Sequence, residues 1–137
     1  MGYLPIRCEK IIIPVHQPSH WVLAVVDLKR KVVSYYDSFL GRDEDVVRKL
    51  IKWVVDEAEN KLEEKWDIAD WKEEYPREIP RQMNGSDCGM FMLSYARNIA
   101  SFTDKALANN AFTFEQKDMV NLRRRLVLEL LKIGMET

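Results

Sequence analysis

Cys88 lies where a turn-forming run meets an apolar segment, a position that favours thiol chemistry. Residues 82–87 are typical of a turn, and residues 90–99 are strongly apolar and helical in appearance. A cysteine in the first turn of a helix lies near the positive end of the helix dipole, which favours the nucleophilic thiolate. The same helix start leaves backbone N–H groups free to bind an oxyanion. We therefore interpret Cys88 as a candidate nucleophile, the alternative being a small buried core residue.

A thiol nucleophile requires a base in contact with it and a third group that orients the base. The chain offers two histidines, His16 and His20. His20 directly precedes an apolar run that begins at Trp21, so we expect its ring at the mouth of a strand. His16 lies in an expected loop between Pro14 and Pro18, which fixes its direction poorly. We favour His20 as the base, against the alternative of a partly exposed hydrogen-bonding residue.

The carboxylate that orients the base should lie on a neighbouring strand at the same end of the sheet. Trp21 begins one expected strand and Asp37 ends the next, so an antiparallel hairpin places Asp37 within reach of the His20 ring. Asp27 would lie at the opposite, turn end of that hairpin. Taken alone, Asp37-Ser38 is better interpreted as the start of a turn, and it is the convergence with His20 that favours the catalytic interpretation.

Gln82 lies a few residues before Cys88, in a loop that should turn back toward the start of the helix. Its side-chain amide could donate a hydrogen bond to the oxyanion beside the Cys88 backbone N–H. Taken alone, Gln82 is better interpreted as a solvated side chain. The charge of Asp87 suits a helix N-terminus but opposes a thiolate, so activation of Cys88 must also rest on His20.

The composition defines a globular protein and restricts its function. The 137 residues suit one domain, 1–137, and are 47% hydrophobic and 31% charged, with a formal net charge of −1. This balance argues against a nucleic-acid binder, and the run Arg123–Arg125 is more typical of a solvated helix face. No apolar run is long enough to span a bilayer, so we expect no membrane partner. Two cysteines cannot form a disulfide framework, which predicts a reducing location, nucleus and/or cytoplasm, and no Cys/His cluster has zinc spacing, so we expect no metal. No cofactor is expected.

Hydrophobic patterns predict an α+β fold, with a small central β-sheet flanked by helices. Strands are expected at residues 11–15, 21–27 and 32–37, with Pro14 ending the first or placing it at an edge. Asp43 is the expected N-cap of a helix that reaches Leu62, and further helices are expected at about 88–101 and 115–132. Residues 66–80 are mixed. The apolar helical positions are Val46, Val47, Leu50, Val54, Ala58 and Leu62, then Met119, Leu122, Leu126 and Leu130.

Three motifs together resemble the Ulp-type (sentrin-specific) SUMO protease family. They are His20-Trp21 before an apolar run, Tyr36-Asp37-Ser38, and the block at 82–91 that reads QMNGSDCGMF. Their order and local spacing match over about residues 11–131, and the last block is highly specific. The resemblance implies the architecture of the papain-like cysteine protease superfamily. It also implies cleavage after the C-terminal Gly-Gly of a ubiquitin-like modifier, with SUMO or SUMO-conjugated proteins as partners, in deSUMOylation and/or precursor processing.

The resemblance assigns a role to each matching residue. Cys88 would be the nucleophile, His20 the base, Asp37 the orienting carboxylate, Gln82 the oxyanion donor, and Trp21 a substrate-binding residue that packs near the catalytic histidine. For Trp21, ordinary core burial is an equally suitable interpretation.

One departure from the family pattern bears on activity. The family's catalytic domain begins well upstream of a segment like 11–15, and the upstream part carries helices, part of the modifier-binding surface and a tryptophan over the Gly-Gly tail. This chain begins just before that segment, so we expect the N-terminal part of the domain to be missing. Its apolar surfaces would then be incompletely covered. The alternative function is a catalytically inactive truncated relative that acts as a SUMO-binding or partner-binding module.

Overall fold

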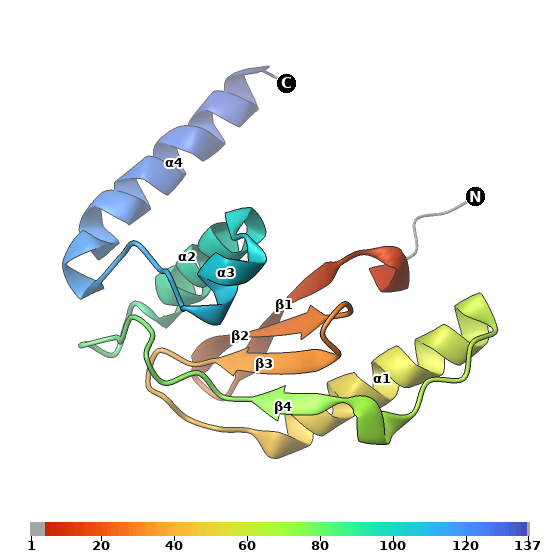
Figure 1. Cartoon of the computed structure of the whole chain (residues 1–137). Coiled ribbons are helices and arrows are strands. Elements are labelled where there is room, and N and C mark those ends of the chain that lie inside the picture. The colour runs from red at the N-terminus through yellow and green to blue at the C-terminus, as the bar shows by residue number, and fades with distance from the viewer. Residues whose placement is uncertain (1–4, 137) are drawn as a thin grey trace.

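Four strands form one sheet that lies between helices (Figure 1). The computed structural model describes residues 5–136. The strands are β1 (Lys10–Gln17), β2 (His20–Asp27), β3 (Val32–Tyr36) and β4 (Lys72–Glu74), in spatial order β1-β2-β3-β4. The helices are α1 (Glu44–Leu62), α2 (Cys88–Ser101), α3 (Asp104–Ala108) and α4 (Met119–Glu136). Short 3₁₀ turns cover Pro5–Arg7, Ile68–Asp70 and Gln116–Asp118. The α+β prediction is confirmed.

The strand β2 is apolar between its polar end residues, His20 and Asp27, because both faces of the sheet are covered. Leu23 and Val25 belong to a core shared with α2, whereas Val22 and Val26 belong to a second core shared with α1. Successive side chains of a strand point to opposite faces, so a doubly covered strand needs apolar residues at every position. In Figure 1, α1 accordingly lies on one side of the sheet and α2 with α3 on the other.

The β2–β3 hairpin was predicted, and Asp27 shapes its turn. The Asp27 carboxylate accepts hydrogen bonds from the backbone N–H groups of Lys29 (3.1 Å) and Arg30 (2.9 Å). Lys31 then adopts a left-handed conformation with φ of 57°. An aspartate side chain that accepts hydrogen bonds from the backbone two and three residues later can shape a hairpin turn in place of the Asn-Gly pair that such turns often contain. The hairpin is antiparallel, with Leu23 opposite Tyr36.

The edge strand β1 is longer than predicted. It continues through Pro14 to Gln17, so the expected loop around His16 is strand, and most of its side chains are half-buried. Proline is tolerated here because β1 has a neighbour on one side alone, and the missing N–H removes no necessary ladder bond. Pro14 therefore marks the edge but does not end the strand.

β4 was not predicted. It runs parallel to β3, with Val32 opposite Lys72, and its three residues are charged. The preceding Trp71 is buried against the α1 side of the sheet and anchors this strand. β4 therefore forms because of tertiary packing, and its own sequence has no apolar pattern that would predict a strand. The short helix α3 was not predicted either.

α1 begins as the sequence indicated. The Asp43 carboxylate accepts a hydrogen bond from the Val46 N–H at 3.1 Å, which satisfies one of the free donors of the first turn. The helix ends at Leu62, and Glu63 caps it in a left-handed conformation. The buried positions facing the sheet are Val47, Ile51, Val54 and Ala58.

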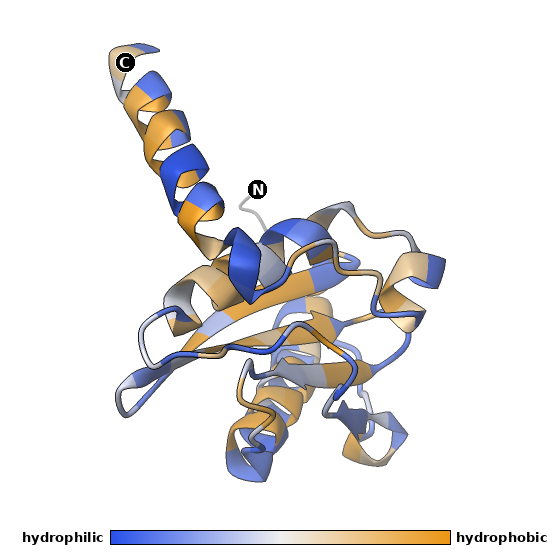
Figure 2. Ribbon diagram, turned by 90° about the vertical axis from the view of Figure 1, so that its left-hand side faces the viewer, coloured by the Kyte–Doolittle hydropathy of each residue, from blue (hydrophilic) through white to orange (hydrophobic). Residues whose placement is uncertain are grey.

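The helices after β4 differ in how much of their surface is covered. α2 has the predicted bounds and lies across β2. α4 contacts the body through Met119, Leu122 and Leu126, but Leu130 is 59% exposed. The helix projects beyond the sheet with apolar residues on its free length (Figure 2). No helix within residues 5–136 is both long and apolar enough to cross a membrane.

Candidate active site

His20 and Asp37 meet at one end of the β2–β3 hairpin. His20 is the first residue of β2, and Asp37 directly follows β3. The His20 Nε2 and Asp37 Oδ1 atoms lie 2.7 Å apart, with both side chains mostly buried. A hydrogen bond of this length to a carboxylate holds an imidazole in one orientation and one tautomer. The structure therefore brings together the predicted base and its predicted orienting group and leaves Nδ1 as the other ring nitrogen.

The turn after β3 holds the Asp37 carboxylate in place. Its Oδ1 atom also accepts a hydrogen bond from the Phe39 N–H at 2.8 Å, and the Leu40 N–H donates to the Asp37 carbonyl at 2.8 Å. The Phe39 ring stacks on the His20 imidazole with 5.1 Å between ring centroids. A Cβ atom added at Gly41 would lie 2.6 Å from Asp37 Oδ2, so glycine permits the close approach of this turn.

Gln82 is buried beside the end of β3. Its Oε1 atom accepts a hydrogen bond from the Ser38 hydroxyl at 2.8 Å, and its backbone N–H donates to the Ser38 carbonyl at 3.0 Å. Its Nε2 atom donates to the Asn84 carbonyl at 2.6 Å. These contacts fix the direction of the amide, and a primary amide carries two N–H groups, so one remains beyond the bond to Asn84. The solvated alternative for Gln82 is wrong, because the residue is 5% exposed.

Cys88 is the first residue of α2 and is half-buried with a free thiol. α2 packs over β2, and a Cβ atom built on the next residue, Gly89, would lie 4.0 Å from Trp21 Cδ1. Trp21 is the neighbour of His20 in the chain. The first turn of α2 therefore lies against the start of β2, where the His20–Asp37 pair is located.

Trp21 lies at the rim of this region. Its side chain is 39% exposed and packs against the His16 ring, with 4.7 Å between centroids. His16 is exposed on the edge strand and pairs with Trp21 across the ladder. His16 thus contacts the tryptophan, whereas His20 contacts the carboxylate, which agrees with the preference for His20.

Asp87 is a site residue whose connections the sequence did not reveal. It precedes α2, but its carboxylate makes no capping bond to the helix. It accepts hydrogen bonds from Asn84 Nδ2 (2.7 Å), Gln116 Nε2 (2.9 Å) and Arg123 Nε (3.0 Å). These donors, with Asn84 first and Arg123 next, lower the pKa of Asp87 from 3.8 to about 2. Arg123–Arg125 are exposed, as predicted for a solvated face, but Arg123 also binds this buried carboxylate, which the sequence did not indicate.

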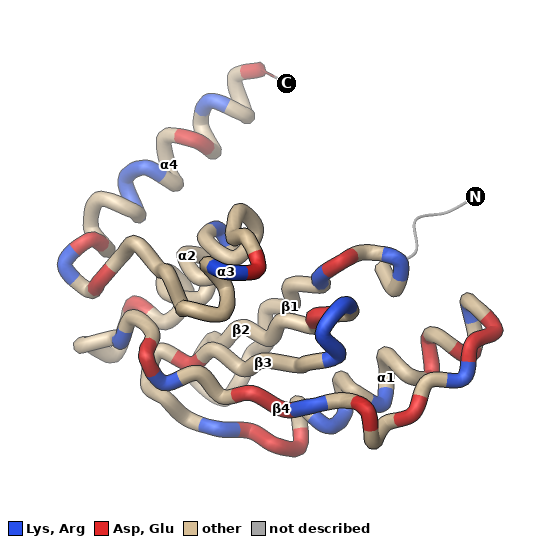
Figure 3. Tube along the Cα trace, in the orientation of Figure 1, with Lys and Arg blue, Asp and Glu red and all other residues tan. Residues whose placement is uncertain are grey.

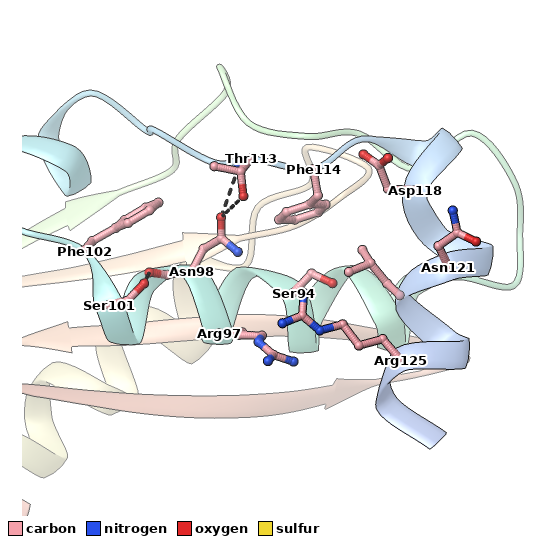
Figure 4. Close-up of a pocket in the computed structure, with 11 residues that line it drawn as sticks. Ser94, Arg97, Asn98, Ser101, Phe102, Thr113, Phe114, Asp118, Asn121 and Arg125 are labelled. Carbon is pink, nitrogen blue, oxygen red and sulfur yellow. Dashed lines mark hydrogen bonds between the residues drawn. The ribbon is translucent and has the colours of Figure 1, made fainter. Parts of the chain in front are cut away.

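A cavity of about 500 Å³ lies away from these residues, between α2 and the segment that leads into α4 (Figure 4). In it the Asn98 Oδ1 atom accepts hydrogen bonds from the Thr113 N–H and hydroxyl at 3.1 and 3.2 Å. Its lining includes no predicted site residue. Within residues 5–136, no group of three or more histidine, cysteine, aspartate or glutamate side chains has a geometry suited to a metal ion.

A cysteine at the start of a helix that covers the sheet, with a histidine and an aspartate at adjoining strand ends, is the arrangement typical of a cysteine protease. Residues 6–135 match the profile of the Ulp1 protease family, C-terminal catalytic domain. The chain belongs to the Ulp1 protease family.

Individual relatives agree with this assignment. Ubiquitin-like-specific protease 1A of Arabidopsis thaliana is 37% identical over 136 residues, which is 99% of this chain and 26% of the relative. The solved catalytic domain of the Chaetomium thermophilum Ulp1-like SUMO protease superposes with a TM-score of 0.69 at 32% identity, covering 90% of this chain and 45% of that one.

A further solved structure holds the C-terminal Ulp1 protease domain in complex with Smt3, the yeast ortholog of SUMO. It superposes with a TM-score of 0.57 at 27% identity over 85% of this chain and 49% of that one. This chain thus spans about half the length of the solved domains it matches, and about a quarter of the Arabidopsis relative.

Proposed function

We propose that this protein is a thiol protease that cleaves after the C-terminal Gly-Gly of a ubiquitin-like modifier, with SUMO as that modifier. The observation that carries the proposal is the 2.7 Å contact between His20 Nε2 and Asp37 Oδ1, at the strand end against which the Cys88 helix begins. Simple binding of a partner does not require an oriented imidazole at the strand end against which a cysteine-bearing helix begins, so the geometry favours catalysis over a binding module.

In the proposed reaction, each group has one task. His20 takes the Cys88 proton through Nδ1, while Asp37 holds Nε2 and stabilises the imidazolium that forms. The thiolate attacks the carbonyl carbon of the terminal glycine, and a tetrahedral oxyanion forms. The Cys88 backbone N–H and the second amide N–H of Gln82 bind that oxyanion.

The intermediate then collapses as the carbon–nitrogen bond breaks. The imidazolium of His20 gives its proton to the departing amine, which leaves a thioester between Cys88 and the modifier. Water, deprotonated by His20, hydrolyses this thioester and restores the free thiol. Trp21, exposed beside the histidine, is proposed to contact the peptide that enters the site.

The relatives support the choice of modifier. A Ulp1 domain of this fold has been solved with Smt3, the yeast ortholog of SUMO, and a second relative of this fold is described as a SUMO protease.

Labelling by a SUMO probe tests the proposal. SUMO that ends in a C-terminal vinyl sulfone forms a thioether with an activated thiol, and the product is resolved by gel shift and mass spectrometry. We expect labelling of the intact protein and of a Cys8→Ala control, because Cys8 lies outside the site. We expect none for Cys88→Ala and a much slower reaction for His20→Ala.

The same experiment separates the outcomes. Equal labelling of the intact protein and Cys88→Ala would refute the catalytic assignment. Binding of fluorescent SUMO without labelling or turnover would favour the inactive binding module instead. A parallel ubiquitin probe reports whether the modifier is SUMO, since preferential labelling by ubiquitin would overturn that part of the proposal.

A further inference from the structure

Asp87 presents an electrostatic problem for the nucleophile. It is 8% exposed, its pKa of about 2 keeps it ionised at neutral pH, and it directly precedes Cys88. A neighbouring negative charge disfavours a thiolate and raises the pKa of a thiol. A protein that depends on the Cys88 thiolate must therefore compensate this carboxylate.

The compensating charge comes from the beginning of α4. Arg123 donates to Asp87 Oδ1 through Nε at 3.0 Å and through a terminal nitrogen at 2.5 Å. The same terminal nitrogen donates to the Ser86 carbonyl at 3.3 Å. A guanidinium that binds one carboxylate through two nitrogens is held in direction as well as in charge.

Gln116, just before α4, holds both ends of the same loop. Its Oε1 atom accepts a hydrogen bond from the Met83 N–H at 2.7 Å, and its Nε2 atom donates to Asp87 Oδ2 at 2.9 Å. Met83 follows Gln82, and Asp87 precedes Cys88. One side chain thus fixes the segment that separates the proposed oxyanion donor from the proposed nucleophile. Figure 1 shows this loop beside the start of α4.

We propose that Arg123 and Gln116 are positioning residues for the nucleophile: Gln116 sets the path of the 83–87 loop, and Arg123 neutralises Asp87 so that Cys88 ionises. The inference rests on the proposed function, because it assigns α4 a task in thiol activation. Within the run Arg123–Arg125, the inference assigns this role to Arg123 alone.

Other charges around the site are accounted for. The charged and titratable groups on the elements that surround the start of α2 are the His20–Asp37 pair at the β2–β3 end and the Asp87–Arg123 pair, which joins the 83–87 loop to α4. In the 3₁₀ turn before α4, the ionisable side chains engage one another or the local backbone: Glu115 with Lys117 at 3.5 Å, and Asp118 with the Glu115 N–H at 2.8 Å. Elsewhere, positively and negatively charged residues are spread over the described chain, some of them in short runs of one sign (Figure 3).

The test is the rate of Cys88 alkylation by iodoacetamide as a function of pH, read by mass spectrometry on the peptide that contains Cys88. Because thiolate is the reacting form, the profile gives the thiol pKa without any protease assay. In Arg123→Gln we expect a higher thiol pKa and alkylation at pH 7 slower by about three- to tenfold, a tenfold change being one pKa unit. The matched control is Arg124→Gln, which removes the same charge one position along α4 and should leave the profile unchanged.

Variants of Asp87 distinguish an electrostatic effect of Arg123 on the thiol from a structural one. The double variant Asp87→Asn/Arg123→Gln removes the carboxylate charge together with the guanidinium that neutralises it, so we expect the pKa of the Cys88 thiol to return toward that of the intact protein. A merely structural role for Arg123 predicts no such return. Asp87→Asn alone leaves Arg123 uncompensated, so its Cys88 should alkylate faster than normal at pH 6.

Three results would overturn the proposal. They are an equal shift in Arg123→Gln and Arg124→Gln, no restoration in the double variant, or an unchanged thiol pKa in Asp87→Asn. For Gln116, we expect Gln116→Ala to lower kcat for SUMO cleavage with little change in KM. We expect Gln116→Glu to retain a lower kcat than Gln116→Asn. If no variant cleaves SUMO while the alkylation shifts hold, the proposed function fails and this inference about Arg123 stands.

Discussion

Replacing Gly41 by alanine tests the geometry of the His20–Asp37 pair without touching either residue. The added Cβ would lie 2.6 Å from Asp37 Oδ2, whereas ordinary contacts begin at 3.4 Å. The carboxylate must therefore retreat by about 0.8 Å or rotate. Because Gly41 does not have a positive φ, alanine strains this position through the contact alone.

The size of the effect follows from the bond that is lost. A retreat of this size stretches the 2.7 Å contact between Asp37 and His20 Nε2 beyond the range of a charge-assisted hydrogen bond. Such a bond contributes about 1.5–3 kcal/mol. If the full amount acts on the transition state, kcat falls by about 10- to 150-fold, since 1.36 kcal/mol is tenfold in rate.

The assay is release of a fluorophore from the C-terminus of SUMO, with kcat and KM measured separately. We expect kcat to fall in Gly41→Ala while KM and the melting temperature change little, because residue 41 is exposed. Proton NMR should also show loss or a shift of the hydrogen-bonded imidazole N–H resonance of His20. Gly134→Ala is the matched control, since an added Cβ there meets no atom within 4 Å. Full kcat together with an unchanged imidazole resonance in Gly41→Ala would refute the reasoning.

Three further predictions concern stability. Asp87 has a folded pKa of about 2, below its ordinary 3.8, so its stabilising contribution is present above pH 4 and is lost as pH falls toward 2. Asp87→Asn should therefore lower the free energy of unfolding by about 1 kcal/mol at pH 6, a value reduced because solvent screens the half-exposed Arg123. Near pH 2 the variant and the intact protein should be equally stable, and a difference that stays constant across this pH range would contradict the prediction. Phe91→Ala should cost about 3–5 kcal/mol in urea unfolding, because the ring is fully buried, and a loss below 1 kcal/mol would show that the core relaxes around it. Asp43→Ala should lower the free energy of unfolding by about 1 kcal/mol, because the helix cap is lost. Asp45→Ala, at an exposed neighbouring position, should lower it by less than about 0.5 kcal/mol, and equal decreases in the two variants would count against the cap.

The sequence led to the His20–Asp37 pair because that pair depends on local geometry. The two residues are 17 positions apart and belong to one hairpin whose strands are recognisable from apolar runs. Once the hairpin is antiparallel, the start of one strand and the end of the next must adjoin. The same reasoning correctly placed Asp27 at the opposite end.

Other elements depended on packing that no local pattern records. β4 consists of charged residues and exists because it pairs with β3 beside the buried Trp71. β1 continues through Pro14 because the strand lies at an edge, a location that the topology decides. The predicted apolar face of α4 is covered near Met119 but exposed at Leu130, since the helix leaves the body of the molecule.

The amino-acid sequence alone determined the candidate nucleophile, its base and the orienting carboxylate, because residue type, order and short-range strand geometry are sufficient for them. Tertiary structure alone decided how Asp87 is neutralised. Gln116 and Arg123 lie 29 and 36 positions from Asp87, and they reach it because α4 packs against α2. A contact of this kind depends on how whole elements pack together, and neither periodicity nor spacing along the chain contains that information.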